Sequence, residues 1–504
     1  MFNTNPTSLD DLLHLDQVAA WLIKRIDPHQ ISNIHHFPLL PLHYVIATRF
    51  AISILRSLPP FMWQTGWYNF VCYGESTCRM TPKKPTLASN ITWLYGLQGM
   101  NYLGAIVLLP YLVRVLGVEQ YGLVAFAQSI AQYFIIATDY GFNFSATRRI
   151  AQNRDNAEEV ARIFWTVNVI KLGLLALGAV CLGLLVVYVP RFQANPGIYF
   201  AAYVAVVGNA IFPVWLFQGM ERMRSIAVIT GLAKLLSVVL VLALVHHRGD
   251  ALLATLLQSA GFLVAGIIGT IVALRHHISA FHRPRRNEIR TAIVEGRHLF
   301  VSTAAISMYS NTNTFLVGLL AGNVQVGYFS LADKFIRAVT GLAGPGIQAA
   351  YPHMISLLAR SRERAIRFIR TSLLTGAALT GVFGIVILAF APALAKIAFG
   401  HNAPAVVPLI RLLAPFPLLG VLNYILGTLV LIPFGFDKLQ SRILLSVGVV
   451  NIALASVLIP RQGAFGGAIS IIVMEFLQLA VMLVFITRQD IRLFGKLLPV
   501  AESV

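Results

Sequence analysis

Long apolar runs separated by short polar segments fill the chain from residue 80 almost to its end. Twelve of these runs are long enough to cross a bilayer as helices, because about 20 mostly apolar residues span its hydrocarbon core. The runs cover residues 90–113, 122–146, 163–188, 197–219, 226–246, 251–274, 298–321, 327–354, 371–395, 404–432, 440–460 and 463–487. The pattern predicts an all-α polytopic membrane protein with twelve transmembrane helices.

Residues 110–160 show this organisation most clearly. A polar turn at residues 116–122 joins two apolar runs, and the second run carries Asp139 shortly before a group of arginines that begins at Arg148. A carboxylate inside a membrane helix is costly and usually faces the bundle interior or a water-filled cavity. The arginines mark the cytoplasmic end of the helix. This combination is typical of a transporter.

Residues 1–79 have a different pattern. Aspartates gather near the start, and one moderately apolar run, residues 37–58, is interrupted by prolines, a histidine and arginines. No signal-peptide pattern precedes the spans, whereas residues 80–84 form a basic start in front of the first one. We predict that residues 1–79 are a disordered or spurious leader. The alternative is an interfacial amphipathic segment.

The distribution of lysine and arginine predicts the orientation. If the N-terminus lies inside, the cytoplasmic segments hold 24 of these residues and the opposite segments hold five. Positive charge gathers in cytoplasmic loops of membrane proteins. We therefore expect both termini to lie in the cytoplasm.

Composition supports the membrane class. The 504 residues are 57% hydrophobic and only 12% charged, against about 25% charged in soluble domains. The net charge of +19 could suggest nucleic acid, but the basic residues lie mostly in short loops, where they set topology. We predict no nucleic-acid partner. The three cysteines have no metal-ligand spacing, and only Cys72 and Cys78 are placed so that they could pair.

The longest cytoplasmic connection, residues 275–297, separates six spans in residues 80–274 from six in residues 298–504. Two weak internal repeats relate the halves: a shift of 205 places Gly117, Gln120 and Gly122 on Gly322, Gln325 and Gly327, and a shift of 216 places residues 219–222 on 435–438. Six spans per half give both halves the same orientation. We predict two parallel six-helix lobes around a central cavity, with chance matching of glycine-rich turns as the alternative.

Eight charged residues lie inside the predicted spans. They are Lys171, Lys234, Lys334, Arg337 and Arg411, with Asp139, Asp333 and Glu475. A charged side chain at a helix centre costs about 2.5–3.5 kcal/mol on insertion scales, so eight of them would not face lipid. We predict that most line a shared aqueous cavity near the midplane. Asp139 is nearer the cytoplasmic end and is a candidate gate.

The turn and the helix after it resemble a known family. The residues that carry the likeness are 110–117, 121–122, 126–127, 133–134, 139–142 and 145–148. They are similar to the O-antigen and capsular polysaccharide flippases of the Wzx type, in the multidrug/oligosaccharidyl-lipid/polysaccharide exporter superfamily. The likeness is sharp in residues 96–160 and extends over 86–490 through the twelve-span layout.

This resemblance implies two six-helix lobes that form a V around a central cavity. The implied activity is the movement of an undecaprenyl-diphosphate-linked oligosaccharide from the inner to the outer leaflet of a bacterial inner membrane. The implied partners are this lipid-linked substrate and membrane lipid, with polysaccharide polymerase machinery as a further candidate. The residues before Met80 depart from the family pattern.

A basic cavity suits a diphosphate, because arginine can bind its oxygens bidentately and lysine can act as a point charge. The candidate substrate-binding residues are Lys171, Lys234, Lys334, Arg337, Arg411 and Arg114. The candidate coupling or gating residues are Asp139, Asp333 and Glu475.

Structural roles are the alternatives for most of these residues. Asp333 and Arg337 are four residues apart on one helix face and could neutralise each other. Lys171 and Lys234 could be structural, and Arg411 could extend outward to the interface. Arg114, at a span end, could be an interfacial anchor.

Other functions fit the sequence less well. No phosphate-binding loop, zinc-protease motif or nucleophile elbow is present, so we predict no enzyme activity, cofactor or metal site. Short non-cytoplasmic loops also disfavour a membrane glycosyltransferase or polymerase. A cation-coupled multidrug exporter of the same superfamily is the alternative function, although a site for drug cations would be net acidic and the embedded charges are net basic.

Overall fold

The computed structural model describes residues 68–72, 78–82, 87–278, 280–341 and 343–489. The chain forms two units, Met1–Pro85 and Thr86–Val504, each described by itself below. In the first unit, strand β1 (Tyr68–Cys72) pairs antiparallel with β2 (Cys78–Pro82). No strand is predicted there from the sequence. The rest of the predicted leader lies outside the described residues, and its disorder stays a prediction.

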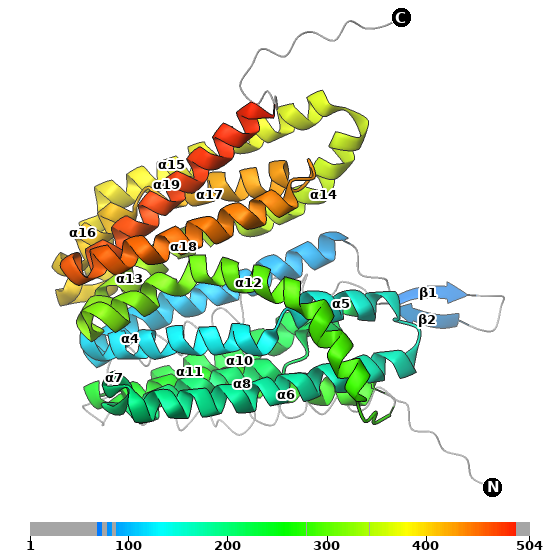
Figure 1. Ribbon diagram of the computed structural model, residues 1–504. Coiled ribbons are helices and arrows are strands. Elements are labelled where there is room, and N and C mark those ends of the chain that lie inside the picture. Colours follow the sequence, from blue (N-terminus) through cyan, green and yellow to red (C-terminus); the bar gives the residue numbers. More distant parts are fainter. Residues whose placement is uncertain (1–67, 73–77, 83–86, 279, 342, 490–504) are drawn as a thin grey trace, which may run out of the picture. The chain divides into compact units, whose positions relative to one another are not determined.

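The second unit is built from helices (Figure 1). Its N-terminal half, residues 87–278, contains α4 (Leu87–Asp139), α5 (Phe142–Gln152), α6 (Ala157–Tyr188), α7 (Pro190–Gln193), α8 (Pro196–Ile211), α9 (Val214–Gly219), α10 (Met223–Leu244), η3 (Arg248–Asp250) and α11 (Ala251–His276). Its C-terminal half, residues 286–489, contains α12 (Arg286–Ala321), α13 (Asn323–Gly341), α14 (Gly344–Arg360), α15 (Arg362–Phe399), η4 (Gly400–Asn402), α16 (Ala403–Leu413), α17 (Phe416–Ile425), η5 (Leu426–Leu431), α18 (Asp437–Gln462) and α19 (Ala464–Arg488).

Each of the twelve predicted spans corresponds to one of these helices or to consecutive ones. Nine helical stretches in the described part of the chain are long and apolar enough to cross a membrane. One of the nine, Val107–Gln152, combines the end of the first predicted span with all of the second, and α12 to α14 are not among them. The all-α polytopic class is confirmed.

Two glycines make the same turn at equivalent places in the two halves. Gly117 interrupts α4 with φ 77° and ψ 166°, and Gly322 separates α12 from α13 with φ 92° and ψ 175°. Glycine adopts such positive φ values readily because it has no Cβ. The predicted shift of 205 residues therefore relates two matching backbone conformations.

The helices that follow these two turns touch each other at a second pair of glycines. A Cβ at Gly122 would clash with the carbonyl of Asn323, and a Cβ at Gly327 would clash with the carbonyl of Val118. Val118 and Asn323 are related by the same shift as Gly122 and Gly327. The contact is therefore reciprocal, as at a twofold interface.

A second turn recurs after α9 and after the π-helical turn η5. Glu221 and Gly435 both have positive φ, 57° and 83°. In each case the next backbone N–H donates to the carbonyl five residues earlier: Arg222 to Phe217 at 2.7 Å and Phe436 to Leu431 at 2.8 Å. This is the usual bonding of a helix C-terminus that ends in a left-handed residue. The turns match at a shift of 214 residues, so the predicted 216 is two residues too long.

Among the described residues, three apolar clusters form the core of the helical unit. The largest joins both halves through α4, α8, α13 and α16 and includes Phe126 and Phe329. A second belongs to the C-terminal half. The third lies mainly in the N-terminal half and is centred on Trp215 and Phe217.

These clusters divide along the length of the helices. We call the end with the connections 153–156, 220–222, 277–285 and 432–436 the arginine-rich end, and the end with the turns at Gly117 and Gly322 the arginine-poor end. The shared cluster occupies the arginine-poor end, whereas the other two occupy the arginine-rich end. The halves therefore share one core at the arginine-poor end and have separate cores at the other.

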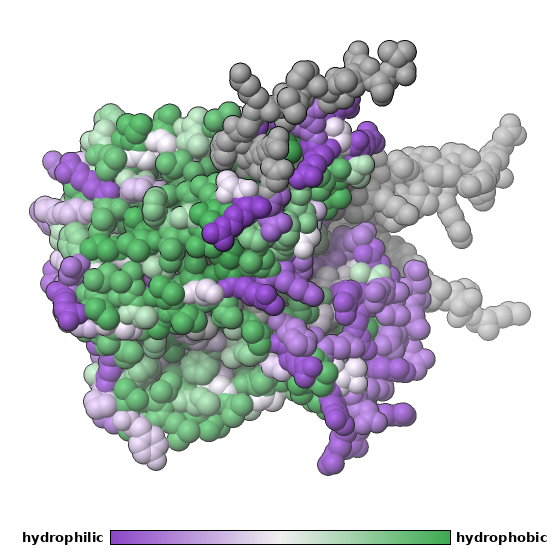
Figure 2. Space-filling view, turned by 45° about the horizontal axis from the view of Figure 1, so that its top comes forward, coloured by the Kyte–Doolittle hydropathy of each residue, from purple (hydrophilic) through white to green (hydrophobic). Residues whose placement is uncertain are grey.

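Large apolar side chains remain exposed along the outer helices, among them Leu177 on α6, Leu232 on α10 and Leu374 on α15. On the face shown in Figure 2, hydrophobic residues cover the broad middle and hydrophilic residues gather toward the ends. An apolar surface of this extent is stable against lipid but not against water. The chain is a multi-pass membrane protein.

Candidate functional site

A polar cluster lies where the two halves meet. We call it the inter-half cluster, and it comprises Tyr121, Gln128, Lys234, Gln258 and Lys334. Lys334 Nζ donates to Gln128 Oε1 at 3.4 Å and lies 5.5 Å from the centroid of the Tyr121 ring. Gln128 Nε2 donates in turn to Gln258 Oε1 at 3.1 Å.

The two lysines of this cluster come from different halves. Lys234 on α10 is half-buried and lies close enough to Lys334 for their positive charges to interact. Lys334 on α13 is exposed, although its ammonium contacts Gln128 of the other half. Lys334 is therefore accessible where the halves meet, and a second cation there would repel it unless an anion lay between them.

Arg337 lies one turn beyond Lys334 and is held by Asp333. Its Nε lies 2.7 Å and 2.9 Å from the two carboxylate oxygens, and its guanidinium lies 5.0 Å from the centroid of the Phe416 ring. The ion pair given above as the alternative to substrate binding is therefore present. Its i, i+4 spacing on α13 brings the two side chains together.

Lys171 and Asp139 also form an ion pair, within the N-terminal half. Lys171 Nζ lies 2.9 Å from Asp139 Oδ1, and the lysine side chain is only 2% exposed. Asn143 donates to the other oxygen of Asp139 at 3.2 Å. Lys171 also donates to the Asn209 carbonyl at 3.5 Å. The sequence identified both charges without indicating that they are partners.

Glu475 belongs to α19 and lies inside the C-terminal half, where it contacts Asn423 of α17. Its side chain is 3% exposed, and Asn423 Nδ2 donates to Glu475 Oε2 at 2.7 Å and to its backbone carbonyl at 2.9 Å. A buried carboxylate needs such donors, because burying a charge without partners is very costly.

The remaining two candidates lie at exposed positions. Arg411 on α16 is exposed, and its side chain makes no ion pair or hydrogen bond with any described residue. Arg114 on α4 donates to the carbonyl of Ile397 on α15, so it bridges the two halves near the arginine-poor end. The structure does not bring either residue into contact with the inter-half cluster.

Arg191 is a contact between the halves that the sequence analysis did not single out. Its Nη2 donates to Asn323 Oδ1 at 3.1 Å, and its guanidinium lies 4.8 Å from the centroid of the Phe126 ring. Burial lowers the pKa of this guanidinium from its usual value, while Tyr199 opposes the shift. The sequence signal for this contact was the repeat, because it marks Gly322 at the turn between α12 and α13 and Asn323 directly follows Gly322.

Ionic and aromatic contacts link α12 to the N-terminal half at the arginine-rich end. Arg162 lies 3.0 Å from Glu159 and 3.7 Å from Glu288 of α12. The Tyr140 and Phe300 rings stack with centroids 4.9 Å apart. The start of α12 is thus attached to the N-terminal half.

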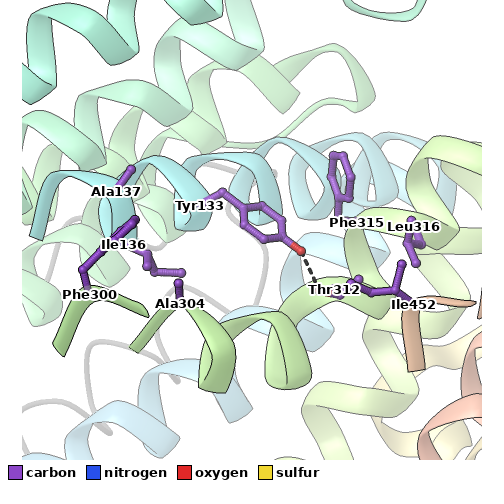
Figure 3. A pocket seen from close by; sticks show the side chains of 9 residues that line it. All are labelled: Tyr133, Ile136, Ala137, Phe300, Ala304, Thr312, Phe315, Leu316 and Ile452. Atoms are coloured by element: carbon purple, nitrogen blue, oxygen red, sulfur yellow. Dashed lines mark hydrogen bonds between the residues drawn. The ribbon is translucent and has the colours of Figure 1, made fainter. Parts of the chain in front are cut away.

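A cavity of about 400 Å³ lies between the inter-half cluster and this end (Figure 3). Its lining residues come from α4, α12 and α18: Tyr133, Ile136, Ala137, Phe300, Ala304, Thr312, Phe315, Leu316 and Ile452. Two of them are polar, and they share a hydrogen bond of 2.8 Å between Tyr133 Oη and Thr312 Oγ1. The other described residues of the lining are apolar.

Across the part of the chain that the structure describes, no three His, Cys, Asp or Glu side chains gather in a way that could hold a metal ion.

Solved structures define the class of this fold. A multidrug resistance MATE family transporter of the MOP superfamily, in an inward-facing conformation, aligns with a TM-score of 0.56 and 16% identity over 80% of this chain and 98% of that one. The lipid II flippase MurJ, in an inward closed conformation, aligns with a TM-score of 0.60 and 10% identity over 80% of this chain and 88% of that one. The fold is similar to the folds of these two transporters.

Sequence comparison gives the family. The family model described as "Polysaccharide biosynthesis protein" matches residues 87–358. Relatives named "Putative O-antigen transporter" are 32% identical in Escherichia coli (strain K12) and 30% identical in Shigella dysenteriae. The alignments cover 81% and 79% of this chain, and 98% and 99% of the relatives. The chain belongs to the polysaccharide biosynthesis protein family, which confirms the resemblance found in residues 96–160.

Proposed function

We propose that the protein is a flippase that moves an undecaprenyl-diphosphate-linked oligosaccharide, an O-antigen or other polysaccharide repeat unit, across a bacterial inner membrane. The observation that carries this proposal is the inter-half cluster, in which the Lys334 ammonium contacts Gln128 and Tyr121 of the other half and has Lys234 of that half nearby. A diphosphate between the two lysines would relieve the repulsion between their charges. The names of the two relatives point to the same substrate class.

The proposed architecture has twelve transmembrane helices in two parallel six-helix lobes around a central cavity. The reciprocal contact of Gly122 with Asn323 and of Gly327 with Val118 supports the repeat. Six predicted spans in each half give both lobes one orientation. The predicted cytoplasmic segments hold 24 basic residues and the opposite segments hold five. This difference supports a cytoplasmic location for the arginine-rich end and for both termini.

Transport by alternating access follows from this arrangement. The halves share a core at the arginine-poor end, where Arg191 contacts Asn323 and Arg114 contacts Ile397. These contacts must separate for the substrate to leave on the outer side. These contacts fit a conformation that is closed to the outside, in which substrate reaches the lysines of the inter-half cluster from the cytoplasm.

The proposed site residues differ in role. Lys234 and Lys334 bind the diphosphate, and Arg337 joins them while Asp333 holds its guanidinium. Lys171 and Asp139 act together as a gate at the arginine-rich end of the N-terminal half. Arg411 and Arg114 contact substrate only after the halves have moved, since neither touches the inter-half cluster in this conformation.

Coupling to a proton gradient is proposed to involve Asp139, Asp333 or Glu475, because embedded carboxylates often relay protons. Glu475 is the most deeply buried of the three. Glu475→Gln keeps an acceptor for Asn423 but cannot lose a proton. Transport that depends on the gradient in the native protein and not in this variant would assign the role to Glu475. An unchanged dependence would remove it.

A cation-coupled multidrug exporter is the second candidate, and the likeness to a MATE family transporter favours it. The net positive inter-half cluster argues against a site for drug cations. A deletion strain separates the two functions. Flippase function predicts lipid-linked repeat units that accumulate on the cytoplasmic side, where polymerase machinery cannot use them. Normal surface polysaccharide with altered drug resistance would favour the exporter.

A further inference from the structure

The charged residues of the proposed site are not among the described residues that line the apolar cavity of Figure 3. Both halves form it, because Tyr133 and Ala137 belong to α4, whereas Ala304 and Thr312 belong to α12. A molecule inside it would therefore contact both halves, and its contacts would change when the halves move relative to each other.

The chemistry of the walls limits what the cavity can hold. Tyr133 and Thr312 satisfy each other, and the other described lining side chains are hydrocarbon or phenyl groups. Sugar hydroxyls or phosphate oxygens would lose their hydrogen bonds with water and find few new partners there, which is costly. A volume of about 400 Å³ lies within the range of small-molecule sites. The cavity suits an apolar chain.

The cavity lies next to the inter-half cluster. Gln128, which holds Lys334, is five residues before Tyr133 on α4, a rise of about 7.5 Å along the helix. Phe315 lies in the cavity wall, and the centroid of its ring lies 5.4 Å from that of Tyr133 and 6.0 Å from that of Phe126. The guanidinium of Arg191 lies over the Phe126 ring. The sites for an apolar group and for an anion are therefore separated by less than two helical turns.

We propose that this cavity holds the apolar polyprenyl chain where it joins the diphosphate, while the diphosphate itself lies at Lys234 and Lys334. The proposal rests on the proposed function and adds a second recognition element to it. A polyprenyl diphosphate has an anion attached directly to an unsaturated hydrocarbon chain, which matches this juxtaposition. The protein would then recognise the lipid carrier common to many substrates, whatever sugars it bears.

The test uses the full-length protein in nanodiscs and a farnesyl diphosphate with a photoreactive diazirine on its first isoprene unit. After illumination, mass spectrometry locates the label. We expect it in peptides that contain residues 133–137 and 300–316. Ala304→Trp fills the cavity and should lower labelling by about tenfold, the effect of about 1.4 kcal/mol. Val301→Trp, on the exposed side of α12, is the matched control and should label normally.

Ala137→Leu fills the same space from α4 and serves if Ala304→Trp does not fold, since Ala137 is exposed into the cavity. If the label is found on other surfaces and is still lost in Lys334→Ala, the cavity proposal is overturned and the flippase proposal remains intact. Competition by farnesol as strong as that by farnesyl diphosphate would overturn the link between chain and anion. Labelling that neither Lys334→Ala nor excess inorganic diphosphate reduces would count against the proposed function itself.

Discussion

The Lys171 ammonium lies 2.9 Å from the Asp139 carboxylate, on a lysine side chain that is 2% exposed. Because each charge neutralises the other, replacing either one alone leaves its partner without a counter-charge. The pair joins the end of α4 to α6 beside Asn143 and Asn209.

We predict that Lys171→Met lowers the free energy of unfolding by about 3–5 kcal/mol, because it leaves a carboxylate without its cation. The double variant Lys171→Met with Asp139→Asn should recover most of this loss. Thermal unfolding in detergent measures both effects. Independent, additive losses in the two single variants would contradict the pairing, and a stable double variant that does not transport would support the gating role.

Gly122 allows the halves to approach at the arginine-poor end, where an added Cβ would meet the carbonyl of Asn323. Gly122→Val should therefore favour separation of the halves at that end. Cysteines placed at Arg191 and Asn323, whose side chains are in contact, report the approach through the yield of cross-linking by a bifunctional thiol reagent. We expect a several-fold lower yield with Gly122→Val, a change of about 1 kcal/mol.

Gly183 on α6 is the matched control, because a Cβ there would meet no atom within 4 Å. Gly183→Val should leave the cross-linking yield unchanged. Equal yields in both valine variants would show that the approach at Gly122 does not limit closure.

Glu288, at the start of α12, should make the folding stability of the protein depend on pH. Partial burial alone would raise its pKa, but the Arg285 backbone N–H, His282 and Arg162 outweigh this and lower the pKa below its usual value. A lowered folded-state pKa stabilises the protein above the unfolded-state value of about 4.3, and this contribution is lost as the pH falls through the folded-state pKa.

Glu288→Gln should therefore reduce the melting temperature at neutral pH, and its difference from the native protein should disappear in acid. Melting curves between about pH 7 and pH 3 measure this. Glu119→Gln is the control, since Glu119 is exposed and makes no ion pair with a described residue. A Glu288→Gln difference that is constant over the pH range would contradict the assignment.

The sequence predicted the helical membrane class because apolar runs of span length leave few other solutions. The repeat was visible at Gly117 and Gly322 because positive φ restricts those positions to few residue types. The shift of 216 was wrong by two residues because the second repeat is carried by a backbone turn that Glu221 and Gly435 make with different side chains.

The site was less predictable. Charges such as Lys171 and Lys334 could be found one by one, because a charge in an apolar run is conspicuous. Their partners depend on helix packing between distant segments, so the pair of Lys171 with Asp139 and the contact of Lys334 with Gln128 were not foreseen. The pair of Asp333 with Arg337 was considered, since i, i+4 spacing alone implies it.

Translocation in proteoliposomes tests the central claim most directly. A fluorescent short-chain polyprenyl-diphosphate oligosaccharide is placed in both leaflets, and a membrane-impermeant reductant quenches the outer one. The native protein should render the inner pool accessible, whereas the double variant Lys234→Gln with Lys334→Gln should slow this by about a hundredfold if each lysine contributes about 1.4 kcal/mol. Lys396→Gln, at an exposed lysine on α15, should match the native rate. Equal rates for the native protein and the double variant would contradict the account.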